Sequence, residues 1–403
     1  MSLPQEVLLI FKRVQKKDPI TKCKAFRELD AYLESIEKYS EEHSNLLTFF
    51  LYHYCRILVN EQDRKVREAA QTTLGSFIKK GVKRLGPHMS KIFPIWFCSF
   101  YDSASEVAAI GRKNFQDAFK DNGERVFKIS FKYFLHFADE HIKQSEEQLS
   151  EGSGNEVSKA VREDTYDRVI SSILMALAES FEFTTSWDQE ERDYYIKKMI
   201  SYLDLKKVAM PKKEGQKSEK YNETKMWLFL GKKNRSRVRS ACLMFISKFL
   251  LNVPKDVAEK HVSEVAPMIF DMIAEDNAIV QGTLWSEALF TLGKQFPEVW
   301  SLINLKKNFI QSMLSCVKNS GFGASLTMYP NLLKFLSVFP LFHLQGFEDD
   351  KLNKFSVKDR AKFLVQFYQH LFAGLKNDEA SIFHGHLIGS YFESLTFVIL
   401  KRF

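Results

Sequence analysis

Apolar residues recur at steps of three and four positions along almost the whole chain, and this spacing places them on one face of an α-helix. The first stripe stops before Lys16-Lys17-Asp18-Pro19, where Asp18 is suited to cap a new helix and Pro19 to occupy its first position. Similar restarts are predicted at five later prolines, in the pairs Gly86-Pro87, Phe93-Pro94, Val253-Pro254, Phe296-Pro297 and Phe339-Pro340. The pattern therefore predicts a succession of helices of about 12–20 residues with short connections.

One local motif recurs within this succession: an acid suited to capping, then a β-branched residue, then Arg and small Ala. Its copies begin near positions 63, 102, 236 and 276, and their valines at 66, 107, 238 and 280 are 41, 131 and 42 residues apart. The middle gap is close to three periods of about 44 residues, and HEAT and armadillo repeats have such periods. We therefore predict an all-α fold, a single continuous, elongated, right-handed HEAT/armadillo-like α-solenoid of stacked helical hairpins over residues 1–403.

Two stretches interrupt the repeats. Residues 144–155 are polar, acidic and glycine-containing, which predicts a flexible loop. Residues 205–234 are predicted to be a basic, mobile insertion, because the segment from Leu205 to Ser240 holds twelve Lys or Arg against three Glu. This surplus of nine charges exceeds the net charge of +8 of the entire chain, but mere solvation of a loop explains it as well as binding does.

Composition narrows the class of protein. The 17 Gly and 10 Pro are about 7% of 403 residues against a typical ~12%, too few turn formers for a many-stranded sandwich, barrel or propeller. No apolar run approaches the ~18 residues of a membrane helix, so we expect no membrane contact. Five dispersed cysteines without a CxxC pair, and a start unlike a secretory signal, indicate a reducing compartment such as the cytosol.

No catalytic constellation is present in the sequence, which lacks a GxSxG elbow, a phosphate-binding loop, a dinucleotide fingerprint and an HExxH helix. The close pair His384 and His386 would point about 200° apart on a helix, so a metal site is not expected there. The cysteines suit small core positions, and Trp96, Trp285 and Trp300 lie in apolar stripes, which favours core packing over base stacking. We therefore expect no catalytic residue, no metal ligand and no cofactor in this chain.

Positive charge at the interhelical turns is the strongest functional signal. In a solenoid these turns line up along one edge, so a basic edge can follow a phosphate backbone. The alternative is structural, because Lys and Arg at helix C-termini also offset the helix dipole, and Arg67 occupies a repeat position that is often an internal ladder residue. The candidate binding residues form three groups: Lys16, Lys17, Lys22 and Lys24; Arg64 and Lys65; and Lys79, Lys80, Lys83 and Arg84.

Six motifs, taken in order, make the chain resemble the N-terminal region of the listerin family. One departure is Lys334, which stands where the family usually has proline. The motifs are residues 16–25 (KKDPITKCKA), residues 63–69 (DRKVREA), the helix pair containing Pro94, Trp96, Asp102, Ala108, Phe115, Ala118 and Phe119, residues 238–241 (VRSA), Trp285 with residues 296–300 (FPEVW), and residues 329–337 (YPNLLKFLS).

The resemblance implies a function that the periodicity alone does not. Listerin-family proteins are large RING-type E3 ubiquitin ligases of ribosome-associated quality control, and their N-terminal part anchors the ligase. The resemblance therefore implies a monomeric, cytosolic domain that docks on the large (60S) ribosomal subunit, through rRNA phosphates and ribosomal proteins near the sarcin–ricin loop. It also implies contact with the nascent-chain-binding quality-control factor.

Ubiquitin transfer and zinc are implied only for the RING, for which this chain has no Cys/His cluster. The alternative to ribosome docking is a karyopherin-like carrier, or another HEAT-repeat scaffold, that binds a protein or peptide. Such carriers are usually acidic, whereas this chain is basic.

Overall fold

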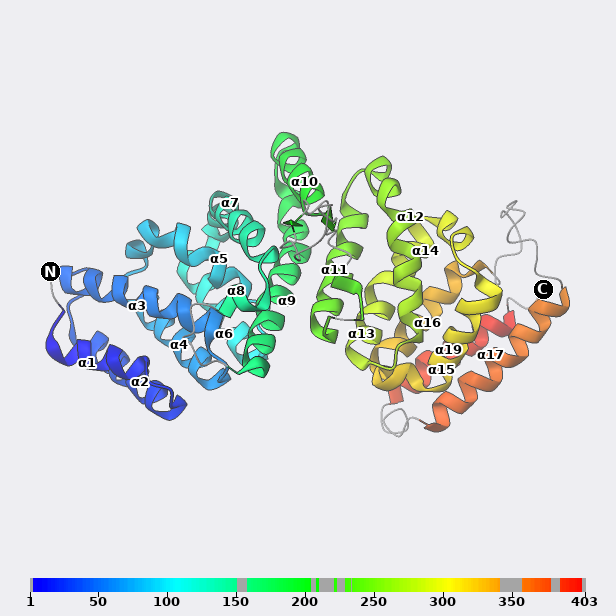
Figure 1. Ribbon diagram of the computed structural model, residues 1–403, viewed down its shortest axis with the longest axis horizontal. Coiled ribbons are helices and arrows are strands. Elements are labelled where there is room, and N and C mark those ends of the chain that lie inside the picture. Colours follow the sequence, from blue (N-terminus) through cyan, green and yellow to red (C-terminus); the bar gives the residue numbers. More distant parts are fainter. Residues whose placement is uncertain are drawn as a thin grey trace, which may run out of the picture. The chain divides into compact units, whose positions relative to one another are not determined.

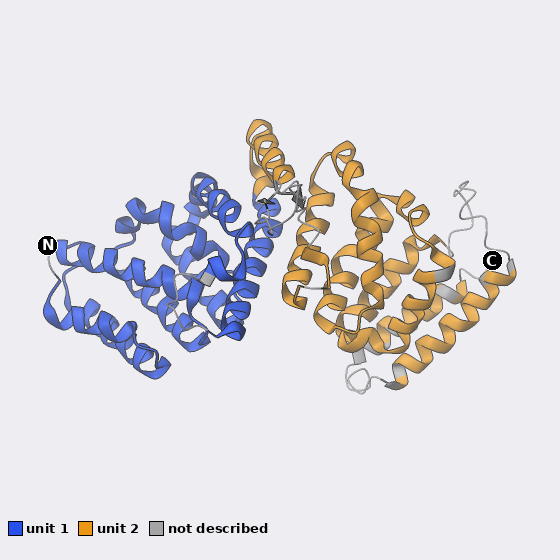
Figure 2. Cartoon of the chain, viewed as in Figure 1, with its two compact units in different colours: residues 1–183 blue, residues 184–403 orange. Residues whose placement is uncertain are grey.

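The computed structural model describes residues 3–150, 158–203, 208–209, 221–222, 229–232, 234–340, 357–377 and 385–400. The chain divides into two compact units, Met1–Phe183 and Thr184–Phe403 (Figure 2). The described part of each unit is built almost entirely of helices (Figure 1). The predicted all-α fold of stacked helical hairpins is confirmed within each unit, and its continuity over residues 1–403 stays a prediction.

The helices of the first unit form two layers. α2, α4 and α6 pack side by side in one layer, α3, α5, α7 and α9 form the other, and α1 packs on α2. Successive hairpins thereby bury each other's apolar faces. The bounds are α1 (Gln5–Val14), α2 (Pro19–Ser35), α3 (Glu41–Asn60), α4 (Arg64–Gly81), the 3₁₀ turn η1 (Val82–His88), α5 (Met89–Ser99), α6 (Ser105–Phe119), η2 (Lys120–Asn122), α7 (Gly123–Ile142), α8 (Glu146–Ser150) and α9 (Lys159–Phe183).

The second unit repeats this construction. α11, α13, α16 and α19 follow one another in one layer, and α15 packs against α17 in the other. The bounds are η4 (Thr184–Ser186), α10 (Gln189–Leu203), the antiparallel strands β1 (Val208–Ala209) and β2 (Tyr221–Asn222), α11 (Ser236–Asn252), α12 (Lys255–Asp271), η6 (Met272–Ala274), α13 (Ala278–Thr283), the π-helix η7 (Leu284–Ala288), α14 (Leu289–Gln295), η8 (Pro297–Ser301), the π-helix η9 (Leu305–Phe309), α15 (Ile310–Lys318), η10 (Ser320–Gly323), α16 (Ser325–Val338), α17 (Val357–Asn377) and α19 (Gly385–Leu400).

Each copy of the recurring sequence motif lies at the start of a helix, namely α4, α6, α11 and α13. The four aligned valines are all fully buried. Asp63 caps α4 as expected, accepting a hydrogen bond from the Lys65 amide at 2.7 Å, while Asn277 rather than the preceding acid caps α13. Hydrogen bonds made by side chains also follow the repeat. One joins Asn114 to Gln71 and another joins Ser240 to Thr283, and in each case the two residues are 43 positions apart.

An internal ladder of ion pairs joins neighbouring repeats. Buried Arg67 pairs with Asp102 at 2.9 Å, 35 residues further on, and buried Arg239 pairs with Glu275, 36 residues further on. Both arginines follow the aligned valine of their repeat directly. The structural interpretation of Arg67 is therefore confirmed, and this residue is not part of a surface for a partner.

Two local expectations differ from the structure. Phe93-Pro94 does not start a helix, because Pro94 lies inside α5, where Phe93, Trp96 and Phe97 are all buried and their packing offsets the amide that proline lacks. Part of the loop predicted over 144–155 is helical: the Ser145 hydroxyl accepts a hydrogen bond from the Gln148 amide and caps α8, whose Leu149 is buried. Residues 151–157 lie outside the described residues.

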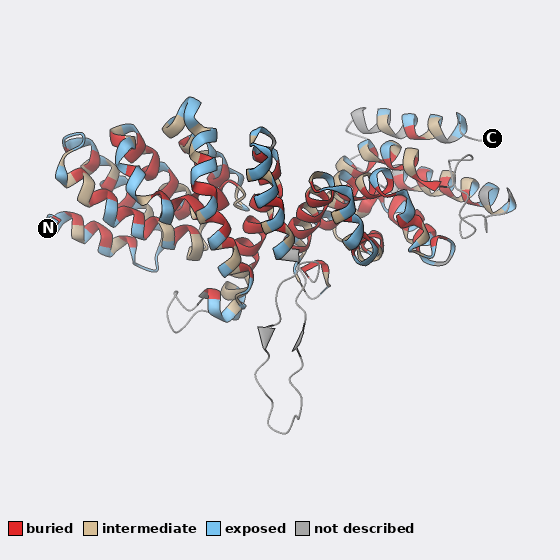
Figure 3. Cartoon of the chain, turned by 90° about the horizontal axis from the view of Figure 1, so that it is seen from above, coloured by how far each residue is buried: buried red, intermediate tan, exposed pale blue. Residues whose placement is uncertain are grey.

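The aromatic residues fill the core, as their spacing predicts. Trp96, Trp285 and Trp300 are each at most 1% exposed, and clusters of phenylalanine pack around them. Figure 3 shows buried residues on the helix faces that meet neighbouring helices and exposed residues on the outward faces. The apolar stripes in the sequence are therefore core positions in both units.

Candidate functional site

The described structure gathers several of the predicted cations around one hollow of about 320 Å³ in the first unit. The hollow lies where the C-terminal end of α1, the N-terminal end of α2 and the C-terminal end of α3 meet. Figure 1 shows these three helices near the N-terminus of the chain. Three helices thus contribute side chains to one place. The lining residues are Val14, Gln15, Lys16, Lys17, Lys22, His53, Arg56, Ile57, Asn60 and Glu61.

Lys16 and Lys17 occupy the tight connection between α1 and α2, and both are exposed. The Asp18 carboxylate holds this connection, because it accepts hydrogen bonds from the amide and the hydroxyl of Thr21 and caps α2. Those hydrogen bonds lower the pKa of Asp18, so the cap is ionised at neutral pH. The cap and Pro19 together fix where the two lysines project.

Lys22 has a structural role that the sequence did not reveal. It forms an ion pair with Glu61, and the two side chains are only 14% and 11% exposed. The pair joins the first turn of α2 to the residue that follows α3. Lys22 therefore lines the hollow, but Glu61 offsets its charge.

α3 supplies the part of the site that sequence reasoning missed. His53, Arg56 and Asn60 lie at steps of three and four on this helix and face the hollow together. Burial, and then the nearby Arg56, lower the pKa of His53, so this ring is neutral at pH 7. The ring stacks on that of Phe11, with 5.1 Å between the ring centroids. Lys16, Lys17 and Arg56 contribute further positive charge to the lining of the hollow.

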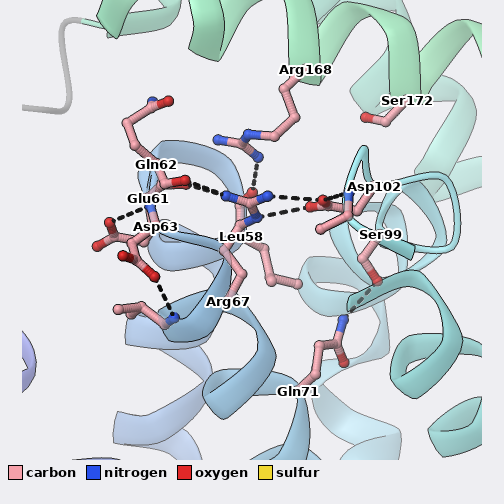
Figure 4. Close-up of polar contacts among 12 residues, drawn as sticks. Leu58, Glu61, Gln62, Asp63, Arg67, Gln71, Ser99, Asp102, Arg168 and Ser172 are labelled. Carbon is pink, nitrogen blue, oxygen red and sulfur yellow. Dashed lines mark hydrogen bonds and ion pairs between the residues drawn. The ribbon is translucent and has the colours of Figure 1, made fainter. Parts of the chain in front are cut away.

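Two buried arginines hold the C-terminal end of α3 in place (Figure 4). Arg67 donates to the carbonyl oxygens of Glu61 and Gln62, each at 2.9 Å, and Arg168 donates to those of Leu58 and Val59 at 2.6 and 2.5 Å. The last carbonyls of a helix have no partner within the helix, so these bonds satisfy them. Burial and the charge of Arg67 lower the pKa of Arg168 to about 10, which still leaves it charged.

The other predicted cations lie outside the hollow. Lys24 is exposed on α2 and is not among the lining residues. Arg64 lies 3.6 Å from Glu106 and Lys65 lies 3.2 Å from Glu68, both as exposed pairs, which contribute little to stability.

The group at the end of α4 divides into two pairs. Lys80 and Arg84 donate to the carbonyl oxygens of Glu34 and Tyr39, so they tie α4 and η1 to the last turn of α2 and to the connection after it. Lys79 and Lys83 are exposed, with no ion pair among the described residues. Sequence alone could not separate these roles, because all four residues fall within one basic run.

The predicted basic insertion, residues 205–234, lies largely outside the described residues, as does His384. Among the residues that the structure does describe, no group of three or more His, Cys, Asp or Glu is placed to hold a metal ion. The same residues include no helix long and apolar enough to cross a membrane. Cys98, Cys242 and Cys316 are buried, and burial raises the pKa of each thiol.

Comparisons with known proteins identify the family. A sequence profile of the N-terminal domain of the E3 ubiquitin-protein ligase listerin matches residues 3–339. The chain is 25% identical to listerin of Gallus gallus and 24% identical to that of Mus musculus, covering 98% of this chain in both cases. It is 24% identical to listerin of Drosophila melanogaster over 99% of this chain.

The chain spans about a fifth of the length of these curated relatives, 20% of the first two and 21% of the third. A solved structure of yeast importin-beta aligns with 99% of this chain and 46% of its own, with a TM-score of 0.35 at 12% identity, and this likeness is too distant to carry an argument. The sequence profile covers most of the chain, and the chain therefore belongs to the family of listerin N-terminal domains.

Proposed function

We propose that this domain anchors its parent ligase on the large ribosomal subunit, and that the hollow between α1, α2 and α3 contacts ribosomal RNA. The observation that carries the proposal is the convergence of Lys16, Lys17 and Arg56 from two separate parts of the chain. Phosphate groups attract such clustered cations, and each contact releases counterions. Contacts to phosphates position a protein on RNA and do not require a particular base sequence.

The family supplies the rest of the proposal. An N-terminal domain of an E3 ubiquitin-protein ligase that docks near the sarcin–ricin loop, and on the nascent-chain-binding quality-control factor, would place the distant RING for ubiquitin transfer. Lys79 and Lys83, which are exposed on a separate part of the first unit, are the candidates for contact with that factor. The domain itself binds and positions; ubiquitin transfer is assigned to the RING of the parent protein.

Co-sedimentation with purified large ribosomal subunits tests the proposal. Lys17→Glu reverses an exposed charge of the hollow, so we expect weaker co-sedimentation and an unchanged Tm. Lys24→Glu is the matched control, because Lys24 is an exposed lysine of α2 outside the hollow. Equal co-sedimentation of the Lys17→Glu variant and the unmodified protein in moderate salt would contradict the proposal.

Lys22→Glu is a poor probe of binding. It would place a second carboxylate beside Glu61, in a pair of which little is exposed, and this like-charge contact should lower the Tm. A loss of co-sedimentation in that variant would report misfolding as much as lost contact. Lys16→Glu combined with Lys17→Glu avoids this ambiguity and should also flatten the dependence of binding on salt.

A further inference from the structure

An exposed aromatic residue lies next to the basic hollow. Tyr52 is 60% exposed, and it precedes Arg56 by one helical turn on the same face of α3. Phe49, one turn before Tyr52, is also exposed and contacts Phe11 of α1 at 6.0 Å between ring centroids. An aromatic stripe thus runs along α3 toward the hollow.

The neighbours of Tyr52 hold its ring in a defined position. The Arg56 guanidinium lies over the ring at 5.7 Å from its centroid, and its Nη1 donates to the Tyr52 hydroxyl at 3.2 Å. His53 meets the ring edge-on at 5.2 Å and is itself buried against Phe11. A tyrosine fixed in this way loses little side-chain entropy when a flat group stacks on its exposed surface.

We propose that Tyr52 is a stacking platform for an unpaired RNA base whose adjoining phosphates lie in the hollow. The argument rests on the proposed function, and it specifies that single-stranded RNA, such as a loop, meets this site. Bases that are unstacked from a helix pack on aromatic side chains, and cations beside them hold the backbone. The Arg56 contact adds to this arrangement, because a guanidinium strengthens stacking through cation–π attraction.

The charge of the site favours an anionic partner such as RNA over an apolar peptide. The hollow has four cationic side chains, Lys16, Lys17, Lys22 and Arg56, and one carboxylate, Glu61. An apolar peptide would gain no binding energy from this excess of positive charge. Tyr194, on α10, is 64% exposed and is not among the residues that line this hollow, so it serves as a comparison.

Fluorescence anisotropy with a short labelled oligoadenylate and the corresponding RNA duplex tests the proposal on the 403-residue chain. Tyr52→Ala should weaken binding of the single strand by about 10-fold, because the base loses the aromatic ring on which it stacks. Duplex binding, which depends on phosphates, should change by less than about twofold. Tyr52→Trp should keep single-strand affinity, and Tyr194→Ala should leave both affinities unchanged.

The outcomes separate this proposal from the proposed function. If Tyr52→Ala weakens both RNAs equally, weakens neither, or the unmodified protein binds no single strand at low salt, the stacking platform is wrong. It is also wrong if Tyr52→Ala reduces binding to large subunits without affecting single-stranded RNA, because the stripe would then meet a protein. Lys17→Glu tests anchoring independently: if that variant loses large-subunit binding in any of these cases, the proposed function stands.

Discussion

At the scale of single residues, His43 links the stability of the first unit to pH. Its ring is fully buried, and neither nitrogen has a hydrogen-bond partner among the described residues. Burial, and then the charges of Arg84 and Lys80, lower the pKa of His43. Above the ordinary pKa of about 6.5 both states are neutral, and below it the unfolded state takes up the proton first, so stability falls as pH falls.

His43→Leu should therefore reduce this acid sensitivity. Urea denaturation near pH 7.5 and near pH 5.5 measures the free energy of unfolding at each pH. Between these two pH values, that free energy should fall by up to about 1 kcal/mol less in the variant than in the unmodified protein. Some sensitivity should remain, because burial also lowers the pKa of His53, His88 and His141. An identical loss in both proteins would show that His43 does not titrate differently on folding.

The buried ion pair between Arg67 and Asp102 offers a second test at the scale of single residues. Asp102→Ala would leave Arg67 buried without its carboxylate, and breaking a buried pair in this way typically costs about 3–5 kcal/mol of unfolding free energy. Glu106→Ala is the control, since Glu106 pairs with Arg64 in solvent and lies in the first turn of α6, so its loss should cost less than about 1 kcal/mol. If both substitutions lowered the free energy of unfolding by similar amounts, the hydrogen bonds from Arg67 to the carbonyl oxygens of Glu61 and Gln62 would be enough to stabilise its buried charge.

At the scale of elements, the sequence predicted where helices begin better than where they continue. Asp18 and Asp63 cap the helices they were expected to cap, because a cap depends only on a few neighbouring residues. Pro94 was misread, since its place inside α5 depends on burial of distant partners. The hollow was predicted only in part: its lysines form a visible run, whereas His53 and Arg56 join them through the packing of α1 on α3.

The N-cap of α3 offers a test at this scale. The Ser40 hydroxyl accepts a hydrogen bond from the His43 amide at 3.0 Å, and α3 carries Tyr52, Arg56 and Asn60. Ser40→Ala should lower the free energy of unfolding by about 1 kcal/mol, and Ser40→Thr should retain most of it. Urea denaturation measures both. Because the far end of α3 is held by Arg67 and Arg168, large-subunit binding of the folded variant should not change.

At the scale of the whole molecule, the repeat period was visible in the sequence, but the division after Phe183 was not. The motif spacing predicted hairpins of about 44 residues, and hydrogen bonds that span 43 residues confirm the repeat in both units. The boundary between the two compact units lies where few contacts join the residues before it to the residues after it. Such contacts depend on the folded structure, so short sequence motifs do not predict the boundary. The family, in contrast, was recognisable because six short motifs keep their order.

The two units should differ in their response to substitutions in the ladder. Asp102→Ala removes a buried partner in Met1–Phe183, and Glu275→Ala removes the matching partner in Thr184–Phe403. In stacked repeats, stability is a sum of local terms, so each substitution should speed amide hydrogen exchange mainly in its own unit. If either variant accelerated exchange equally in both units, the chain would unfold as one cooperative body. A single continuous solenoid with strong coupling between all its repeats would require that result.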